Sequence, residues 1–216
     1  MAQIFSPASN TVAPGVLIGV IVTLCLLGLL DFLIFWSPCA TGVGIPMNQP
    51  VPFSHEHHVG DLGIDCRYCH TGVETAAFAG VPPTHTCMTC HSQLWTEAPM
   101  LAPVRESLVK NEPIRWNRVH NLPDYVYFNH SVHVANGVSC VSCHGRVDGM
   151  PLVAKKKTLY MRWCLECHEH PSGVLRSKAD VFNMASTDPG EAVGRQRMKE
   201  YGIKPAKLLD CSACHR

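Results

Sequence analysis

The sequence predicts a mostly helical and irregular fold, made of duplicated modules and preceded by one N-terminal transmembrane helix. Three observations predict this fold: an apolar segment near the N-terminus, a repeated pattern of histidines and cysteines, and an unusual supply of both residues. The chain has 12 cysteines and 13 histidines among its 216 residues. Its formal net charge of +1 indicates neither a nucleic-acid surface nor an acidic partner.

The apolar segment at 12–36 predicts a membrane anchor. It is apolar or small throughout apart from Thr23 and Asp31, with Pro14 near its start. About 23 residues of helix are enough to cross a hydrocarbon core of roughly 30 Å. A cleaved signal peptide is the alternative, but its apolar region is usually shorter, and no Ala-x-Ala-like site follows here. We therefore expect a cytoplasmic N-terminus at 1–11 and the anchor at 12–36.

Several single residues in or near this segment have a functional interpretation and a simpler alternative. Asp31 is a candidate proton-handling group near a quinone, although its place near the outer interface lets it reach water. Cys39 is a candidate for acylation, but an unmodified thiol is the simpler expectation. Cys25 is expected to be a small apolar helix residue. The basic run 155–157 is interpreted as a solvated loop.

Ten of the cysteines lie in five copies of Cys-x-x-Cys-His, whereas random placement of the same residues predicts about 0.04 copies. Two thiols separated by two residues can each add to one vinyl group of a haem, and the histidine that follows becomes an axial iron ligand. Zinc ribbons and thiol redox sites also use cysteine pairs, but neither requires that histidine. The motifs therefore predict five covalently bound haems c.

The predicted haem-binding cysteines are Cys66, Cys69, Cys87, Cys90, Cys140, Cys143, Cys164, Cys167, Cys211 and Cys214. The predicted proximal iron ligands are His70, His91, His144, His168 and His215.

The part of the chain beyond the anchor has about 35 residues for each haem, too few for a separate hydrophobic core around each one. The haems themselves are expected to form the core. Short helices should carry the motifs, and long irregular connections rich in glycine and proline should join them, as at 41–52 and 80–83.

An internal repeat organises this part of the chain. The unit Phe-x-His-x-x-His, followed by two Cys-x-x-Cys-His motifs, occurs at 53–91 and again at 128–168. The predicted organisation is a linker at 37–52, a first dihaem module and its connection at 53–127, a second dihaem module at 128–182, and a C-terminal segment with the fifth motif at 183–216.

The paired histidines of the repeat are the candidate distal ligands. Residues at i and i+3 share one helical face but project from levels about one turn apart, so one helix can serve two haems. The candidates are His55, His58, His130 and His133, with His120 as the fifth. Three other histidines are less suited as distal ligands because of their positions: His57, His85 and His170. Met150 and Met161 are alternative axial ligands, since a thioether would raise the potential of its haem.

The same residues carry a family resemblance. The Phe-Ser-His-x-x-His and Cys-x-x-Cys-His arrangement resembles the cytochrome c3/c7 superfamily of multihaem electron carriers. The stretch Val-His-Asn-Leu-Pro-Asp-Tyr-Val-Tyr-Phe-Asn-His-Ser-Val-His at 119–133, followed by Met-Arg-Trp-Cys at 161–164, resembles the membrane-anchored pentahaem cytochrome subunit of alternative complex III. In that family, ligation is expected to be mostly bis-histidine, with histidine-methionine exceptions.

This resemblance implies a setting and partners. It implies a bacterial quinol-oxidising respiratory or photosynthetic complex, in which iron-sulfur and polytopic quinol-binding subunits pass electrons to the pentahaem protein. The acceptor would be a mono-haem cytochrome, another periplasmic carrier or a terminal oxidase. Haem c is attached on the exported side, so we expect a single-pass protein of the bacterial inner membrane, with most of the chain on the periplasmic side.

Six-coordinate haems leave no vacant site for a substrate, so the sequence predicts an electron-transfer subunit that is not an enzyme by itself. Two alternatives stay open. One is a free-standing membrane-anchored quinol dehydrogenase that feeds a soluble periplasmic reductase. The other is a haem enzyme that reduces a small oxyanion such as nitrite, a class that usually shows a variant motif or an unligated iron.

Overall fold

The computed structural model describes residues 5–215, so residues 1–4 of the expected cytoplasmic N-terminus lie outside it. By its internal contacts the chain divides into two units, Met1–Val43 and Gly44–Arg216.

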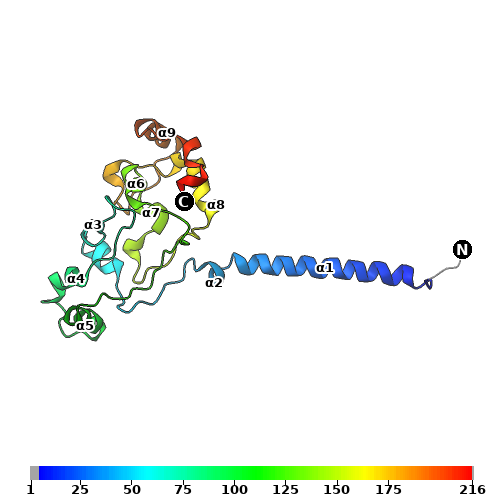
Figure 1. Cartoon of the computed structure of the whole chain (residues 1–216), viewed down its shortest axis with the longest axis horizontal. Coiled ribbons are helices and arrows are strands. Elements are labelled where there is room, and N and C mark those ends of the chain that lie inside the picture. Colours follow the sequence, from blue (N-terminus) through cyan, green and yellow to red (C-terminus); the bar gives the residue numbers. More distant parts are fainter. Residues whose placement is uncertain (1–4, 216) are drawn as a thin grey trace. The chain divides into compact units, whose positions relative to one another are not determined.

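The N-terminal unit is one long helix with a short helix after it (Figure 1). Helix α1 covers Ser9–Phe35, and at 27 residues it is about 40 Å long. Inside it, the Thr23 hydroxyl donates to the Gly19 carbonyl at 2.8 Å, so this polar group is satisfied within the helix. By length and composition α1 can cross a membrane, with a mean hydropathy of 2.7, although a signal sequence would have the same properties.

Helix α1 ends at a proline-containing turn. Trp36 is its C-cap, and Ser37 accepts a hydrogen bond from the Ala40 amide as the N-cap of α2, Pro38–Thr41. Gly42 then takes a left-handed conformation with φ of 68°, which a glycine adopts without steric cost. The predicted N-terminal apolar helix is confirmed.

The second unit contains only short helices. They are η1 Glu56–Asp61, α3 Cys66–Cys69, α4 Thr84–His91, η2 Pro99–Leu101, α5 Ala102–Lys110, α6 His130–Ala135, α7 Cys140–His144, η3 Val147–Gly149, α8 Met161–Glu169, η4 Pro171–Gly173, η5 Lys178–Asp180, α9 Glu191–Glu200, α10 Pro205–Leu208 and η6 Cys211–Ala213. Between residues 5 and 215 there is no strand, only two isolated bridges, Pro46 with Ala154 and Val138 with Leu175. The predicted mostly helical and irregular fold is confirmed.

The two halves of the internal repeat pack on each other reciprocally. The Glu56 amide, at the start of η1, donates to the Met150 carbonyl at 3.2 Å, just after η3. The His130 amide, at the start of α6, donates to the Ala77 carbonyl at 3.1 Å. Each helix that carries paired histidines is thus hydrogen-bonded to the segment that follows the first Cys-x-x-Cys-His of the other half.

One buried arginine joins helix α9 to the rest of the second unit. Arg176 is 3% exposed and forms an ion pair with Asp188, with 2.9 Å between Nη2 and Oδ1. Its amide donates to the Gly137 carbonyl at 2.8 Å, and its carbonyl accepts from the Tyr201 hydroxyl at 3.1 Å. These bonds join the end of α9 to the turn between α6 and α7, next to the third motif.

The apolar core of this unit is small. The buried hydrophobic residues between positions 5 and 215 are Val51, Val73, Val104, Leu175, Val181 and Met184. Six side chains are far too few to offset the conformational entropy that a chain of this length loses on folding. The residues that remain half-exposed around the motifs are the surface that a prosthetic group would cover.

Candidate haem-binding site

The five Cys-x-x-Cys-His sequences, called motifs 1 to 5 in chain order, lie on or beside α3, α4, α7, α8 and η6. In a helix the two cysteines and the histidine, at i, i+3 and i+4, point to one side. Asp65 and Asp210 precede motifs 1 and 5 and cap their helices, by accepting from the Arg67 amide at 2.8 Å and the Ser212 amide at 3.0 Å. Helical spacing therefore places each cysteine pair near its histidine, and side-chain caps add to this in motifs 1 and 5.

Four pairs of histidine rings face one another across nearly equal gaps in the part of the chain that the structure describes. The ring centres are 6.5 Å apart for His55 and His70, 6.2 Å for His58 and His91, 6.4 Å for His130 and His144, and 6.2 Å for His133 and His168. In each pair one ring belongs to a motif. The other ring belongs to α6, to η1 or to His55, the N-cap residue of η1. The structure thus brings each of these predicted distal histidines to a predicted proximal one.

These gaps fit one metal ion between two imidazoles. An imidazole nitrogen lies about 2 Å from a bound transition metal and about 1 Å from its own ring centre, so ring centres about 6 Å apart are expected. The residues present therefore fit four irons with histidine on both faces, as haem c would supply.

The hydrogen bonds of the rings leave the other nitrogen free for iron. The Nδ1 atom of seven proposed ligands lies 2.7–3.2 Å from a main-chain carbonyl oxygen and donates to it. The pairs are His58 with Ser54, His70 with Gly80, His91 with Leu94, His130 with Ala77, His133 with Asn129, His168 with Leu208 and His215 with Tyr125. Such a bond fixes the tautomer whose Nε2 carries a lone pair, which is the metal-binding form.

A phenylalanine orients the distal pair in each half of the repeat. The Phe53 ring stacks on His58 at 4.4 Å and meets His55 edge-on at 4.8 Å. The Phe128 ring stacks on His133 at 4.4 Å and meets His130 edge-on at 4.8 Å. The same geometry therefore recurs in both halves, and it gives the phenylalanine of the repeat a role in holding both rings.

Burial keeps several of these histidines neutral. It lowers the pKa of His55 to about 4 and that of His144 to about 3, and neighbouring histidines lower both further. Burial also lowers the pKa of His133. A neutral imidazole is the form that binds a metal, so these sites are ready for a ligand at neutral pH.

The cysteines of the motifs are free thiols. None of the cysteines in the described chain forms a disulfide. Between residues 5 and 215, no cluster of three or more cysteine, histidine or acidic side chains has the geometry of a metal site, as a structural zinc would require. Burial raises the pKa of Cys140 to about 11 and of Cys143 to about 12, and nearby cysteines raise both further.

Motif 5 has a different partner. His215 Nδ1 donates to the Tyr125 carbonyl at 3.1 Å, and the two rings lie 5.9 Å apart. The Tyr127 amide donates to the Cys214 carbonyl at 2.8 Å. Within residues 5–215, no second histidine ring faces His215, so the structure places no histidine across the fifth site.

His120 lies elsewhere. Its ring centre is 4.3 Å from that of His144, and the two rings are inclined by 75°. Its Nε2 is buried without a hydrogen-bond partner, and burial lowers its pKa to about 4. The structure therefore places His120 beside motif 3, and its assignment to the fifth iron stays a prediction.

The remaining candidates lie away from the ring pairs. His57 is exposed and lies 3.5 Å from the Asp61 carboxylate. His85 and His170 are exposed as well. Met161 is 61% exposed at the start of α8, while Met150 contributes its carbonyl to the bond with Glu56.

No sequence pattern indicates the main-chain groups that hold the rings. The carbonyls of Ala77, Gly80, Leu94 and Leu208 accept the Nδ1 hydrogen bonds, but any residue has a carbonyl. Only the fold brings them to the histidines. The sequence also does not predict the side-chain hydrogen bond between motifs 1 and 2. In that bond the Tyr68 hydroxyl lies 2.8 Å from the Thr89 hydroxyl.

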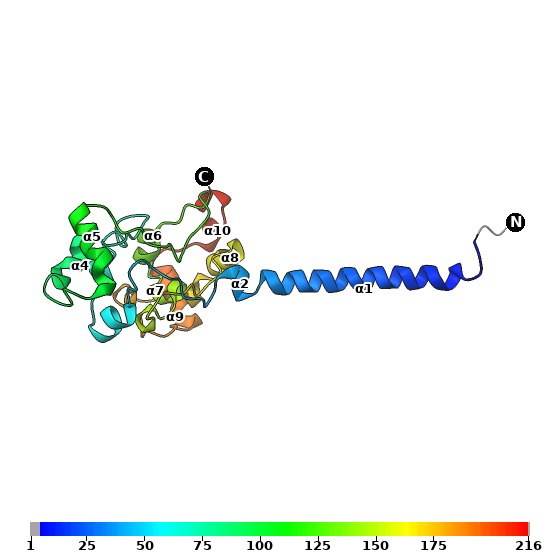
Figure 2. The same ribbon diagram turned by 90° about the horizontal axis from the view of Figure 1, so that it is seen from below.

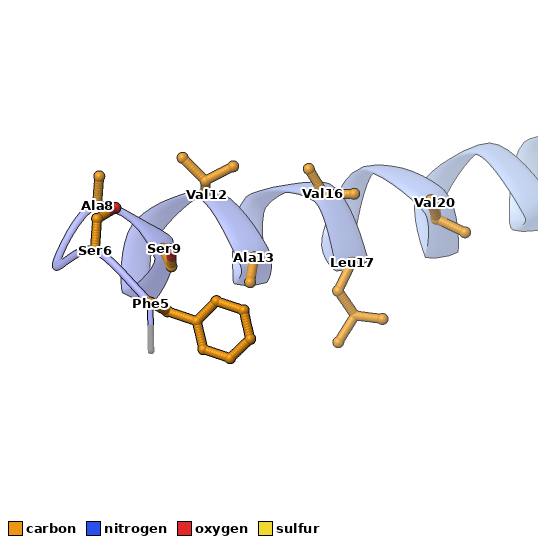
Figure 3. A pocket seen from close by; sticks show the side chains of 9 residues that line it. All are labelled: Phe5, Ser6, Ala8, Ser9, Val12, Ala13, Val16, Leu17 and Val20. Carbon is orange, nitrogen blue, oxygen red and sulfur yellow. The ribbon is translucent and has the colours of Figure 1, made fainter. Parts of the chain in front are cut away.

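One hollow lies outside the motifs, at the start of α1 (Figure 3). There the Phe5 ring lies beside the helix, and the lining is almost wholly apolar, with Val12, Val16 and Leu17 among it. No titratable or metal-binding side chain lines it. This hollow is a groove on the apolar surface of α1, and it has no catalytic or ligand-binding groups.

Comparison with known proteins agrees with the geometry. Residues 132–216 match the family described as cytochrome c3, a match that includes motifs 3 to 5. The chain is also 28% identical over 168 residues to the multiheme cytochrome c subunit of menaquinone reductase from Nitratidesulfovibrio vulgaris strain Hildenborough, over 77% of this chain and 67% of the relative. The chain therefore contains a cytochrome c3-like domain and is a multihaem cytochrome c of electron transport.

Proposed function

We propose that this multihaem cytochrome carries five covalent haems c and relays electrons between a membrane quinone-oxidoreductase complex and a carrier on the outer face of the membrane. The observation that carries the proposal is the set of four histidine ring pairs, each with one ring from a motif and centres 6.2–6.5 Å apart. The fifth motif has the same sequence pattern.

The ring pairs support electron transfer rather than chemistry on a substrate. Haem supplies a metal that changes oxidation state, and two histidines would occupy both axial positions of each iron. The residues of this chain then hold the irons in place, fix the imidazole tautomers through Nδ1 and set the potentials by burial. We propose that the chain is not an enzyme by itself but a subunit of one.

The distal assignments form part of the proposal. His55, His58, His130 and His133 serve the irons of motifs 1 to 4, in the pairs that their rings form. For motif 5 the proposed ligand is His120, with Met150 and Met161 as alternatives. Five residues separate His120 from Tyr125, whose carbonyl contacts His215, and five residues reach at most about 17 Å.

The proposed setting is an assembly in a bacterial inner membrane. Helix α1 would be its single anchor, with Met1 inside and the motifs outside, because haem c is attached on the exported side. The resemblance at 119–133 supports an alternative complex III-like assembly with iron-sulfur and polytopic quinol-binding subunits. The similarity to a protein named as a subunit supports an assembly over the free-standing quinol dehydrogenase.

The direction of electron flow has two candidates. The resemblance to alternative complex III supports flow from quinol to a periplasmic acceptor or terminal oxidase. The relative is named a menaquinone reductase, which supports flow from a periplasmic donor into the quinone pool. Bis-histidine haems conduct in either direction, so the partners and their potentials would set it.

Two measurements test the proposal. The intact mass of the purified protein should exceed that of the chain by five haems, and a smaller number would show that a motif is not used. Extraction in mild detergent should co-purify an iron-sulfur subunit and polytopic subunits in stoichiometric amount. If the protein purifies alone and is nevertheless reduced by quinol, the free-standing dehydrogenase is correct and the proposed complex is wrong.

A further inference from the structure

Motifs 1 and 2 are neighbours. Helix η1 and its N-cap carry both of their distal partners, since His55 faces His70 and His58 faces His91. The Tyr68 hydroxyl, inside motif 1, is hydrogen-bonded to the Thr89 hydroxyl, inside motif 2, at 2.8 Å. Burial raises the pKa of the Cys69 thiol, and the nearby Cys87 thiol raises it further.

Motifs 3 and 4 are neighbours in the same way. Helix α6 carries both of their distal partners, His130 opposite His144 and His133 opposite His168. Burial raises the pKa of Cys143 to about 12, and Cys167 of motif 4 is the next largest cause. The repeat thus places two irons beside each helix that carries a distal pair.

The two pairs meet through motifs 1 and 3. The amide of His130, the proposed distal ligand of motif 3, donates to the carbonyl of Ala77, which follows motif 1. A β-carbon on Gly60 of η1 would collide with the carbonyl of Asp148, which follows motif 3. After burial, Cys66 of motif 1 is the largest cause that raises the pKa of Cys140 of motif 3. Motifs 2 and 4 make no comparable contact with the opposite pair among residues 5–215.

Motif 5 adjoins motif 4. His168 of motif 4 donates from Nδ1 to the Leu208 carbonyl at 2.9 Å, just ahead of motif 5. Helix α10, which ends at Leu208, packs on α8, which carries motif 4. Burial raises the pKa of Cys164, and Cys214 of motif 5 raises it further.

Exposure changes along this series of contacts. Ser139, directly before motif 3, is 1% exposed. Cys90 of motif 2 and Cys211 of motif 5 are exposed. Figures 1 and 2 show α4, with motif 2, at one end of the second unit, and α8 and α10 at the other end.

We infer that the haems lie in one unbranched file in the order motif 2, motif 1, motif 3, motif 4, motif 5, so that electrons enter and leave at motifs 2 and 5. The inference rests on the proposed relay and deepens it. The order in space differs from the order in the chain because η1 and α6 each hold two irons, and only motifs 1 and 3 join the two pairs. Motif 3 is then a bridge that every electron must cross.

A density map of the haem-loaded protein in detergent tests the order directly. The four shortest iron-to-iron separations should join motifs 2 and 1, 1 and 3, 3 and 4, and 4 and 5. A map in which motif 2 adjoins motif 3, or motif 5 adjoins motif 1 or 2, would overturn the inference.

Photoreduction from the two ends tests it in solution, in a background where Cys25 and Cys39 are replaced by Ser. A ruthenium photosensitiser is attached at Gln93→Cys, beside motif 2, or at Lys207→Cys, beside motif 5. Both residues are exposed. In the Cys140→Ser/Cys143→Ser variant, which lacks the haem of motif 3, each label should rapidly reduce only half of the remaining haem.

The matched control is Cys211→Ser/Cys214→Ser, which removes a terminal haem. From the Gln93→Cys label, all of the remaining haem should still be reduced rapidly, because motifs 2, 1, 3 and 4 stay contiguous. Full rapid reduction in the variant without the haem of motif 3 would disprove the file. If a variant fails to fold, the density map of the unaltered protein decides the order.

The two failures are distinguishable. If the intact mass shows fewer than five haems, the proposed function is incomplete, whatever the arrangement of the motifs. If all five haems are present but the separations or the reduced fractions differ from those given above, the relay stands and the order is wrong.

Discussion

At the scale of single residues, one hydrogen bond decides which nitrogen of seven proposed ligands is left free for a metal. His58 and His133 donate from Nδ1 to the carbonyls of Ser54 and Asn129, four residues earlier. This bond leaves Nε2, at the far end of the ring, free to bind a metal. The phenylalanine stacked on each ring prevents it from turning.

His58 and its neighbour His57 form a matched pair for testing this arrangement. We expect His58→Ala to leave one haem of the five five-coordinate, giving a high-spin signal and carbon monoxide binding in about one-fifth of the reduced haem. His57→Ala should leave every haem low-spin, because His57 is exposed and contacts Asp61. Carbon monoxide difference spectra measure both, and equal spectra for the two variants would contradict the assignment.

The stabilising effect of Asp65 on the helix of motif 1 depends on the charge of its carboxyl group. It caps α3, and its side-chain hydrogen bond with Arg67 is the largest cause that lowers the pKa of the carboxyl to about 2. The folded pKa lies below the ordinary value, so the contribution of Asp65 to stability is present above about pH 4 and is lost as the pH falls through about 2.

The expected cost of Asp65→Ala is about 1 kcal/mol, because the cap is removed. Asp65→Asn keeps a capping oxygen and should cost less, and its difference from the natural protein should vanish below about pH 2. Thermal unfolding of the haem-loaded protein, followed from neutral pH to below pH 2, measures this. A difference that persists unchanged in acid would show that the ion pair with Arg67 does not contribute.

At the scale of elements, the two halves of the repeat share a sequence pattern but not a helix type. Helix α6 is an α-helix whose N-cap Asn129 accepts from the Val132 amide. Segment η1 is a π-helix, with wider bonds such as that from the Leu62 amide to the His57 carbonyl. A π-helical turn often marks a functional site, and this one begins directly after His55 and carries His58.

The packing of η1 depends on Gly60. A β-carbon there would collide with the Asp148 carbonyl, so Gly60→Ala should cost about 1–3 kcal/mol and displace η1 with its two histidines. Gly149→Ala, in the facing η3, is the control, because nothing lies within 4 Å of its β-carbon. Thermal unfolding and the low-spin haem spectrum measure both variants. Equal stability of the two would show that η1 and η3 do not pack closely.

At the scale of the whole molecule, the small apolar core makes the fold depend on its cofactors. Its fully buried large side chains are few, with Leu175, Val104 and Val181 as the main ones. At about 1.5–3 kcal/mol per side chain, these three contribute about 5–9 kcal/mol, far less than the conformational entropy that a chain of this length loses on folding. The surfaces around the motifs have to be covered before the second unit is stable.

The chain made without haem attachment should therefore lack a folded second unit. Hydrogen exchange should find no protected amides beyond α1, and the helical signal that remains should come mainly from Ser9–Phe35. The haem-loaded protein is the control and should protect α6 to α8. Protected amides in α7 without haem would show that the polypeptide core is sufficient.

Much of this protein is predictable from its sequence. The apolar run that forms α1, the mostly helical and irregular fold and the multihaem class are predicted by sequence patterns and are confirmed. Each depends on a local pattern: apolar length, a fixed spacing of cysteines and histidine, or a paired histidine at i and i+3. Local patterns survive folding because the residues concerned are already neighbours in the chain.

The fifth distal position is not predictable in the same way. The sequence favours His120 only by its place along the chain, and in the structure this residue lies against His144. A distal ligand comes from elsewhere in the chain, and no spacing rule relates it to the motif that it serves. His55 and His130 are easier to assign because the repeat marks them twice.

The sequence by itself determined which residues are candidates for attaching the haems and for binding their irons from the opposite face, because covalent attachment and helical pairing need fixed short spacings. Only the tertiary structure decided which ring faces which, which carbonyls fix the tautomers and which motifs are neighbours. The ring pairs join residues 14 to 35 positions apart, and some of the tautomer-fixing bonds reach further, such as those of His168 with Leu208 and His130 with Ala77. They depend on how helices pack, and packing follows from shape and burial in three dimensions rather than from any local pattern.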